Sequence, residues 1–221
     1  MAEPLIRLWR KDEMWKRCHD KRHTTTAFNR SGTGDARFSP LHTSTGALIP
    51  TLYAGSTDEC VMMETLFHAL PTDLDGFIFD LDDLASAVMS GVAPTRDLRL
   101  IELTTVGLRR FKLKKSEVIE TGPLIYPNTR SLAQDWHRHH PDVDGLLWVS
   151  RQYDESMACV LFGDRVKSAE LKAVKLAESV FEPHILSAML RLGTRLGIEK
   201  IYTAGSGVAT FAELMNHARI L

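Results

Sequence analysis

Two continuous apolar runs near the middle of the chain constrain its fold most strongly. They span residues 146–149 and 157–162, and the polar segment 150–156 separates them. Runs of this kind, without alternating polar residues, are typical of strands that are covered on both faces of a sheet. We therefore predict a central antiparallel hairpin, with other elements packed on both of its faces.

Further strands are predicted by short apolar runs that end at turn residues, namely 5–10, 48–54, 77–81, 99–103 and 171–176. Residues 11–26 are strongly polar and are expected to form a solvated helix or loop. Helix signals predict a helix from Ser56 or Thr57 to Pro71, a second from residue 128 or 129 to Pro141, a third at 181–192 after a capping box, and a last one at 210–219. Strands and helices do not alternate regularly. This order favours an α+β class, with mixed or antiparallel sheets and flanking helices, over a doubly wound fold.

The chain has 221 residues, 44% of them apolar and 25% charged, as in an ordinary globular protein with one full domain. Its formal net charge of -1 provides no overall field that would attract nucleic acid or an anionic membrane. The N-terminus lacks the features of a signal peptide, and no apolar run approaches the roughly 18 residues of a membrane span. The three cysteines are far apart, which indicates free thiols and a cytoplasmic location.

Several common catalytic patterns are not supported. The Gly32-Thr33-Gly34 loop lacks the spacing of a dinucleotide or P-loop motif. Among His137, His139 and His140, only the first and last have a spacing that suits a helical metal site, and no glutamate completes the pattern. We therefore expect no metal and no bound cofactor.

Four polar or aromatic side chains remain as a candidate site. Arg37 follows a glycine-containing loop, Tyr53 ends a strand, Glu64 lies at the border of the apolar face of a helix, and Ser150 ends a buried strand. Strand ends can hold polar side chains rigidly beside a cleft. The residue types alone leave two interpretations open: a functional constellation, or a structural ion pair with a core tyrosine.

The sequence around these positions resembles the RES-domain family, which is named after an arginine, a glutamate and a serine. The matching segments are LWR at 8–10, GDARFSP at 34–40, LYAGS at 52–56, ET at 64–65 and DGLLWVSR at 144–151. The resemblance covers about residues 5–165. We therefore divide the chain into a catalytic domain at 1–165 and a strand and helix extension at 166–221, which is expected to pack on the same domain; pairing of two subunits through its helices is the alternative.

The resemblance implies an ADP-ribosyltransferase-like fold and an enzyme that degrades NAD. The nicotinamide–ribose bond would be cleaved by phosphorolysis or hydrolysis, and the protein would act as a toxin that an Xre-type antitoxin neutralises. The family's residues carry over to catalytic Arg37, Glu64 and Ser150 and to substrate-binding Arg10, Phe38, Tyr53 and Arg151. At position 38 the family often has tyrosine or tryptophan, so the phenylalanine of this chain keeps stacking but lacks a hydroxyl.

The chemistry of these residue types fits the implied reaction. A guanidinium binds diphosphate oxygens in a bidentate manner, which suits Arg37, and Tyr53 offers a flat face to nicotinamide. A fixed carboxylate such as Glu64 stabilises the cationic ribose that forms when nicotinamide leaves, while Ser150 orients the ribose or a phosphate oxygen. Inorganic phosphate as acceptor would need a second cationic group, for which Arg10 and Arg151 are candidates. Two alternatives stay open: an ADP-ribosyltransferase that modifies a macromolecule, and a silent module that binds NAD or a partner.

Overall fold

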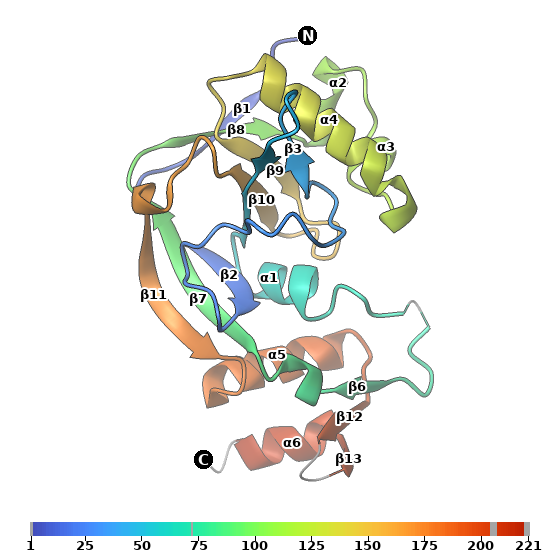
Figure 1. Cartoon of the computed structure of the whole chain (residues 1–221). Helices are drawn as coiled ribbons and strands as arrows, with labels where there is room; N and C mark the ends of the chain where they lie inside the picture. Colours follow the sequence, from blue (N-terminus) through green and yellow to red (C-terminus); the bar gives the residue numbers. More distant parts are fainter. Residues whose placement is uncertain (1, 72, 204–206, 219–221) are drawn as a thin grey trace.

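An eight-stranded mixed sheet forms the centre of the computed structural model, which describes residues 2–71, 73–203 and 207–218 (Figure 1). Its strand order is β1-β8-β9-β10-β5-β2-β7-β11. The strands are β1 (Ile6–Trp9), β2 (Trp15–Asp20), β5 (Thr51–Gly55), β7 (Ala87–Pro94), β8 (Leu98–Glu102), β9 (Gly145–Val149), β10 (Met157–Phe162) and β11 (Leu171–Ser179). Strands β8 and β9 are parallel, and the other neighbours in this sheet are antiparallel. The predicted α+β class with mixed sheets is confirmed.

The predicted central hairpin is β9 and β10. Val149 is paired with Met157 at the turn, and Gly145 with Leu161 at the far end. Strand β5 pairs with the other edge of β10, so the hairpin lies inside the sheet. Alternate side chains along it enter two different buried clusters, which explains why its sequence shows no polar positions.

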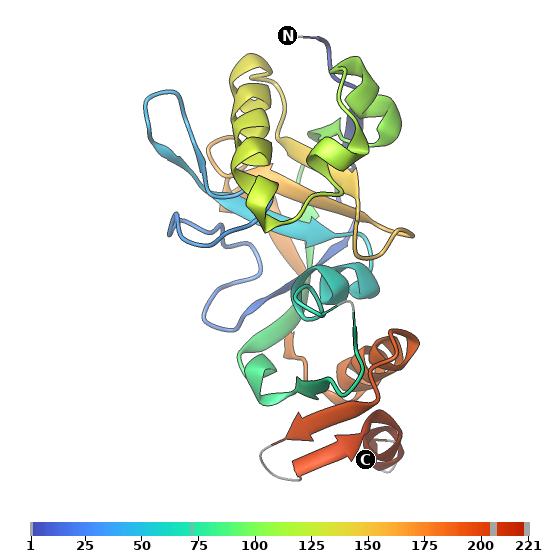
Figure 2. The same ribbon diagram turned by 90° about the vertical axis from the view of Figure 1, so that its right-hand side faces the viewer.

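Helices lie at both ends of the sheet (Figures 1 and 2). They are α1 (Asp58–Thr65), α2 (Thr105–Arg110), α3 (Lys115–Val118), α4 (Tyr126–His139), α5 (Pro183–Arg195) and α6 (Phe211–Ala218), with 3-10 turns η1 (Asp82–Leu84), η2 (Pro123–Ile125) and η3 (Ser168–Glu170). Two small sheets complete the fold: β3 (Leu41–His42) with β4 (Leu48–Ile49), and β13 (Gly207–Thr210) with β12 (Lys200–Thr203) and β6 (Ile78–Asp80). Within the described ranges, every helix is too short or too polar to cross a membrane.

The main sheet is nearly divided between β5 and β2. These strands are paired only at Gly55 and Lys16, whereas β5 pairs with β10 along its whole length. Helix α1 begins directly after this point. A Cβ atom at Gly55 would lie 2.8 Å from both the Cys60 sulfur and a Val61 methyl group, so glycine is what allows α1 to pack against the strand end.

Helix α1 starts as its sequence predicts and ends earlier. Thr57 is the N-cap, and its hydroxyl accepts a hydrogen bond of 3.1 Å from the Cys60 amide. The helix ends at Thr65 instead of continuing to Pro71. The cause lies in the backbone: the amides of residues 66 and 67 both bond to the Met62 carbonyl, which breaks the regular pattern.

Other predictions were wrong in instructive ways. Residues 15–20 were assigned to a solvated helix or loop, but they form β2, in which Trp15 and Arg17 are buried against β7. Strand β7 was not predicted, because Ser90, Gly91 and Pro94 interrupt its apolar pattern although all three are buried. The strands β12 and β13 and the helices α2 and α3 were also not predicted.

The C-terminal part of the chain joins both the sheet and the helices. Strand β11 forms the edge of the main sheet beside β7, and α5 packs against α1 through a cluster that includes Met62, Phe67 and Met189. Helix α5 starts at Pro183 with Glu182 as N-cap, so the capping box predicted from Ser179 does not form. The last predicted helix corresponds to α6, and its predicted final residue, 219, lies outside the described residues.

Candidate functional site

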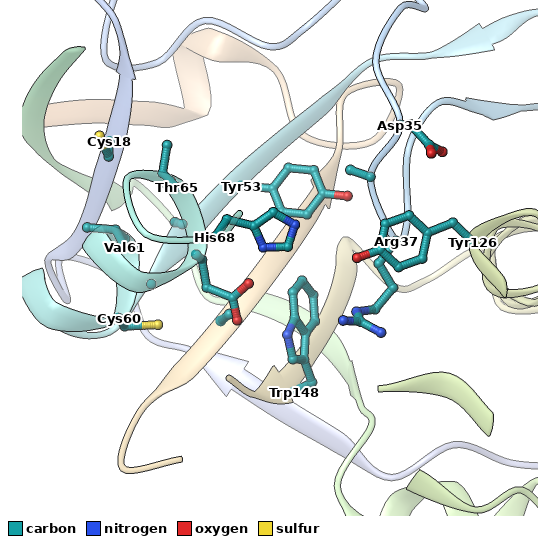
Figure 3. Close-up of a pocket in the computed structure, with 15 residues that line it drawn as sticks. Cys18, Asp35, Arg37, Tyr53, Cys60, Val61, Thr65, His68, Tyr126 and Trp148 are labelled. Atoms are coloured by element: carbon teal, nitrogen blue, oxygen red, sulfur yellow. The ribbon is translucent and has the colours of Figure 1, made fainter. Parts of the chain in front are cut away.

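A cavity of about 300 Å³ lies where β5 and β2 diverge (Figure 3). Its walls come from the ends of β5, β9 and β10, from β2, from α1 and the residues after it, from the start of α4 and from the loop that precedes β3. The residues that line this cavity are distant in sequence, and the folding of the chain at this junction brings them together.

Arg37 forms one end of the cavity and is held by the segment before α4. Its Nη1 donates to the Thr121 hydroxyl at 2.6 Å and to the Val118 carbonyl at 3.1 Å. The guanidinium carbon lies 5.3 Å from the centre of the Tyr126 ring, within cation–π distance. Burial lowers the pKa of Arg37, yet a guanidinium remains charged at neutral pH. A fixed cation therefore faces the cavity.

Glu64 enters the cavity from α1 and is tied to Ser150. The Ser150 hydroxyl donates to Glu64 Oε1 at 2.6 Å, and its oxygen accepts from the amides of Gln152 at 3.2 Å and Tyr153 at 3.0 Å. Ser150 itself is fully buried. Because the hairpin turn fixes this hydroxyl, Ser150 in turn fixes the orientation of the Glu64 carboxylate.

Aromatic rings form the walls between these two groups. Figure 3 shows Tyr53, Trp148 and Tyr126 around the same space. The Tyr53 hydroxyl lies 3.2 Å from the Ser39 hydroxyl, and burial raises the pKa of Tyr53 to about 12, so the ring is a neutral wall at physiological pH. Such rings offer flat apolar surfaces to a planar ligand.

The end of the cavity opposite Arg37 has a different character. Cys18, Cys60 and Val61 line it (Figure 3). Burial raises the pKa of both thiols to about 12, which keeps them neutral. The cavity therefore runs from a cationic end at Arg37 to a neutral, largely apolar end at the cysteines.

The structure brings some of the predicted site residues together and separates others. Arg37, Tyr53 and Glu64 line the cavity, and Ser150 is bonded to Glu64. Arg151 donates to the Thr121 carbonyl at 2.5 Å, and the hydroxyl of the same Thr121 accepts from Arg37. Phe38 does not line the cavity; it is fully buried behind it, with its ring 5.1 Å from that of Trp148.

Arg10 lies outside the cavity. Its side chain is 65% exposed and forms a salt bridge of 2.9 Å with Asp97. Strand β1 is separated from β5 by β8, β9 and β10. An arginine at its end therefore lies away from the cavity and from the other residues predicted to bind substrate.

Sequence reasoning missed several residues of this site, among them Tyr126, Trp148, Thr121 and His68. Trp148 sits inside a continuous apolar run, where a wall residue and a core residue look alike. Tyr126 is the first residue of α4, which starts before the predicted residue 128 or 129, and the proline that follows it was the available signal for a helix start. His68 lies within the helix predicted to reach Pro71, whereas the observed helix ends at Thr65.

The histidines near the end of α4 have other partners. His137 lies 2.8 Å from the Asp164 carboxylate, and His139 lies 2.8 Å from the Asp135 carbonyl. Among the described residues, no three metal-binding side chains come together at one point.

Comparison with known protein families gives one match. The model of the RES domain matches residues 14–184, which is most of the chain and extends past residue 165. No curated protein matches the sequence. A match to this family indicates an NAD-related, toxin-like function at a coarse level.

Proposed function

This chain belongs to the RES-domain family, and we propose that it degrades NAD by breaking the bond between nicotinamide and ribose. One observation carries the proposal: a single cavity holds a fixed guanidinium, Arg37, at one end and the Glu64 carboxylate, hydrogen-bonded to Ser150, in its wall. Diphosphate needs the first group, and a cationic ribose needs the second.

The two ends of the cavity suggest how NAD would lie in it. The diphosphate would face Arg37, and the nicotinamide ring would occupy the neutral end beside Cys18 and Cys60. A volume of about 300 Å³ is at the lower limit of ligand pockets, so it would take the nicotinamide half. The adenosine half would then extend past Arg37 and out of the cavity.

The reaction needs no metal or redox cofactor in this proposal. The bond between the ribose C1′ and the nicotinamide nitrogen breaks, and its electron pair stays on the nitrogen, so nicotinamide leaves as a neutral molecule. Glu64 stabilises the oxocarbenium ion that remains. An oxygen of phosphate or water then bonds to C1′; attack by water releases a proton to solvent. Arg151 does not line the cavity, but it contacts Thr121 as Arg37 does, and it is the cationic group that we assign to a phosphate acceptor.

A product analysis tests the proposal. Purified protein would be incubated with NAD, with and without inorganic phosphate, and the products identified by mass spectrometry. Release of nicotinamide only with phosphate, together with ADP-ribose phosphorylated at C1′, is expected if phosphate is the acceptor. Release in both reactions, together with ADP-ribose, is expected if water is the acceptor. Absence of nicotinamide release under all conditions would contradict the proposal. ADP-ribose attached to an added protein or nucleic acid would instead identify a macromolecular transferase.

The proposal extends to a toxin controlled by an antitoxin. Expression of the chain in bacteria should lower the NAD pool and stop growth, and a partner of the Xre type should restore both. Growth arrest with an unchanged NAD pool would separate toxicity from this chemistry.

A further inference from the structure

His68 is an ionisable side chain of the cavity to which the proposed reaction assigns no role. It follows the end of α1, lines the cavity and is exposed to solvent, so it lies at the mouth. Figure 3 shows its imidazole ring on the same cavity as the ring of Tyr53. Glu64, which precedes it by four residues, lines the same cavity.

Gln152 determines which nitrogen of His68 carries the proton. Its side-chain nitrogen Nε2 lies 3.4 Å from the His68 carbonyl oxygen and 3.4 Å from His68 Nδ1. A carbonyl oxygen only accepts hydrogen bonds, so the amide group must point its NH₂ toward His68. Nδ1 is then an acceptor as well, and the neutral imidazole carries its proton on Nε2.

The same turn positions His68 and Glu64. The backbone amide of Gln152 donates to the Ser150 hydroxyl, which itself donates to Glu64. The side chain of Gln152 contacts His68. Residues 150–152 therefore link two side chains of the cavity, a carboxylate and an imidazole.

We propose that His68 is a substrate-binding residue that donates a hydrogen bond from Nε2 to a ligand oxygen at the cavity mouth. The inference rests on the proposed function, since the ligand is taken to be NAD. With the proton on Nε2, the neutral ring cannot act as a base through that atom. His68 instead remains a donor in both its neutral and its protonated form. A ribose hydroxyl and a phosphate oxygen share the required acceptor chemistry.

Other ionisable groups also surround this position, and they must be considered in any pH experiment. The groups that line the cavity with His68 are Cys18 on β2, Asp35 and Arg37 before β3, Tyr53 on β5, Cys60 and Glu64 on α1, and Tyr126 on α4; Arg151 and Tyr153 flank Gln152.

The substitution Gln152→Glu tests the tautomer directly. A carboxylate accepts from Nδ1–H, so the neutral ring would lose its proton from Nε2 and could no longer donate. We expect the KM for NAD to rise about five- to tenfold at pH 8. Gln134→Glu adds the same charge on α4, outside the cavity, as the control. An unchanged KM at pH 8 would overturn the proposal.

Variants of His68 itself test the donor. His68→Ala should raise the KM for NAD about five- to tenfold with little change in kcat, and His68→Gln should restore most of the loss because it keeps an N–H donor of similar reach. His184→Ala on α5 is the control for loss of an exposed imidazole. Equal KM values for the alanine variant and the wild type would contradict the inference.

Truncated substrates and NMR complete the test. If the effect of His68→Ala persists with nicotinamide riboside, the acceptor is a ribose oxygen; if it requires nicotinamide mononucleotide or NAD, the acceptor is a phosphate oxygen. Nitrogen-15 NMR reads the tautomer without any turnover, and we expect Nε2–H in the wild type and Nδ1–H in Gln152→Glu at pH 8. If the NMR spectra show these tautomers but NAD is not turned over, the proposed function is refuted and the tautomer of His68 is not. If the tautomer is unchanged in Gln152→Glu, the role of Gln152 is refuted.

Discussion

Replacing Glu64 by glutamine removes one negative charge from the cavity and preserves the shape of the side chain. The Ser150 hydroxyl donates to Glu64 Oε1 at 2.6 Å, and the amide oxygen of a glutamine can accept the same hydrogen bond. The variant should therefore fold with its cavity intact. What it loses is the electrostatic stabilisation of a positive charge on the ribose.

The size of this loss follows from the position of Glu64, which is partly exposed. Opposite charges about 4 Å apart interact by roughly 4 kcal/mol at the effective dielectric constant of about 20 that applies near a protein surface. A loss of this size in the transition state corresponds to about a 10³-fold decrease in kcat. The Ser150 hydrogen bond changes from charge-assisted to neutral, which costs about 1 kcal/mol of stability, or roughly 2–4 °C in Tm.

The assay is release of nicotinamide from NAD, measured for Glu64→Gln beside the melting temperature of the same preparation. Glu59→Gln is the control, because Glu59 lies on the same helix but does not line the cavity. We expect the control to keep its kcat despite a comparable small loss of stability. A Glu64→Gln variant that retains a kcat within tenfold of the wild type would refute the role of this carboxylate.

Three further predictions follow from the same cavity. Arg37→Ala should abolish NAD binding in calorimetry, whereas Arg10→Ala should leave binding and turnover unchanged because Arg10 is paired with Asp97 outside the cavity; equal effects would contradict the placement. Gly55→Ala should lower the Tm by several degrees and weaken NAD binding, since the added Cβ would meet atoms of α1 at 2.8 Å; a neutral result in both assays would show that α1 can shift without cost. Burial raises the pKa of Cys18 and Cys60 to about 12, so only about one thiol in 10⁴ is ionised at pH 8. Alkylation of these thiols by iodoacetamide, measured by mass spectrometry, should therefore be slow in the native protein and fast in urea.

The candidate site could be predicted further than the fold because its residues lie at recognisable ends of elements. Ser150 follows directly after the apolar strand β9, and Glu64 was placed at the border of an apolar helix face, where the structure finds it partly buried. Tyr53 was predicted to end its strand but is the middle residue of β5, and its side chain still lines the cavity. Arg10 shows the limit of this reasoning. Its neighbour Trp9, the last residue of β1, is fully buried, whereas Arg10 directly after the strand is exposed, so a segment shared with a family can serve folding rather than the ligand.

The predictions for β2 and β7 failed for the same reason. The sequence does not show which polar side chains are buried beside a hydrogen-bond partner. Arg17 looked solvated, but its guanidinium donates to the carbonyls of Thr25 and Ala27 in the loop that covers β2. Ser90, opposite Arg17 in β7, is buried and lies 2.9 Å from His19. Polar side chains of β2 and β7 are thus buried because they have hydrogen-bond partners in the neighbouring strand or in the loop. Neither strand therefore shows the apolar pattern on which strand prediction depends.

The location of the cavity follows from the same pairing of strands. A continuous sheet would leave no room beside Tyr53, because a neighbouring strand would cover the edge of β5. On that edge, β5 instead meets Asn29 at Thr51 and Lys16 at Gly55. Helix α1 then begins within three residues of Gly55, capped by Thr57, and brings Glu64 to the gap. The glycine that ends β5 and the helix cap that follows it therefore place the carboxylate, and a substitution that moves either one should reduce the activity without touching a ligand-binding side chain.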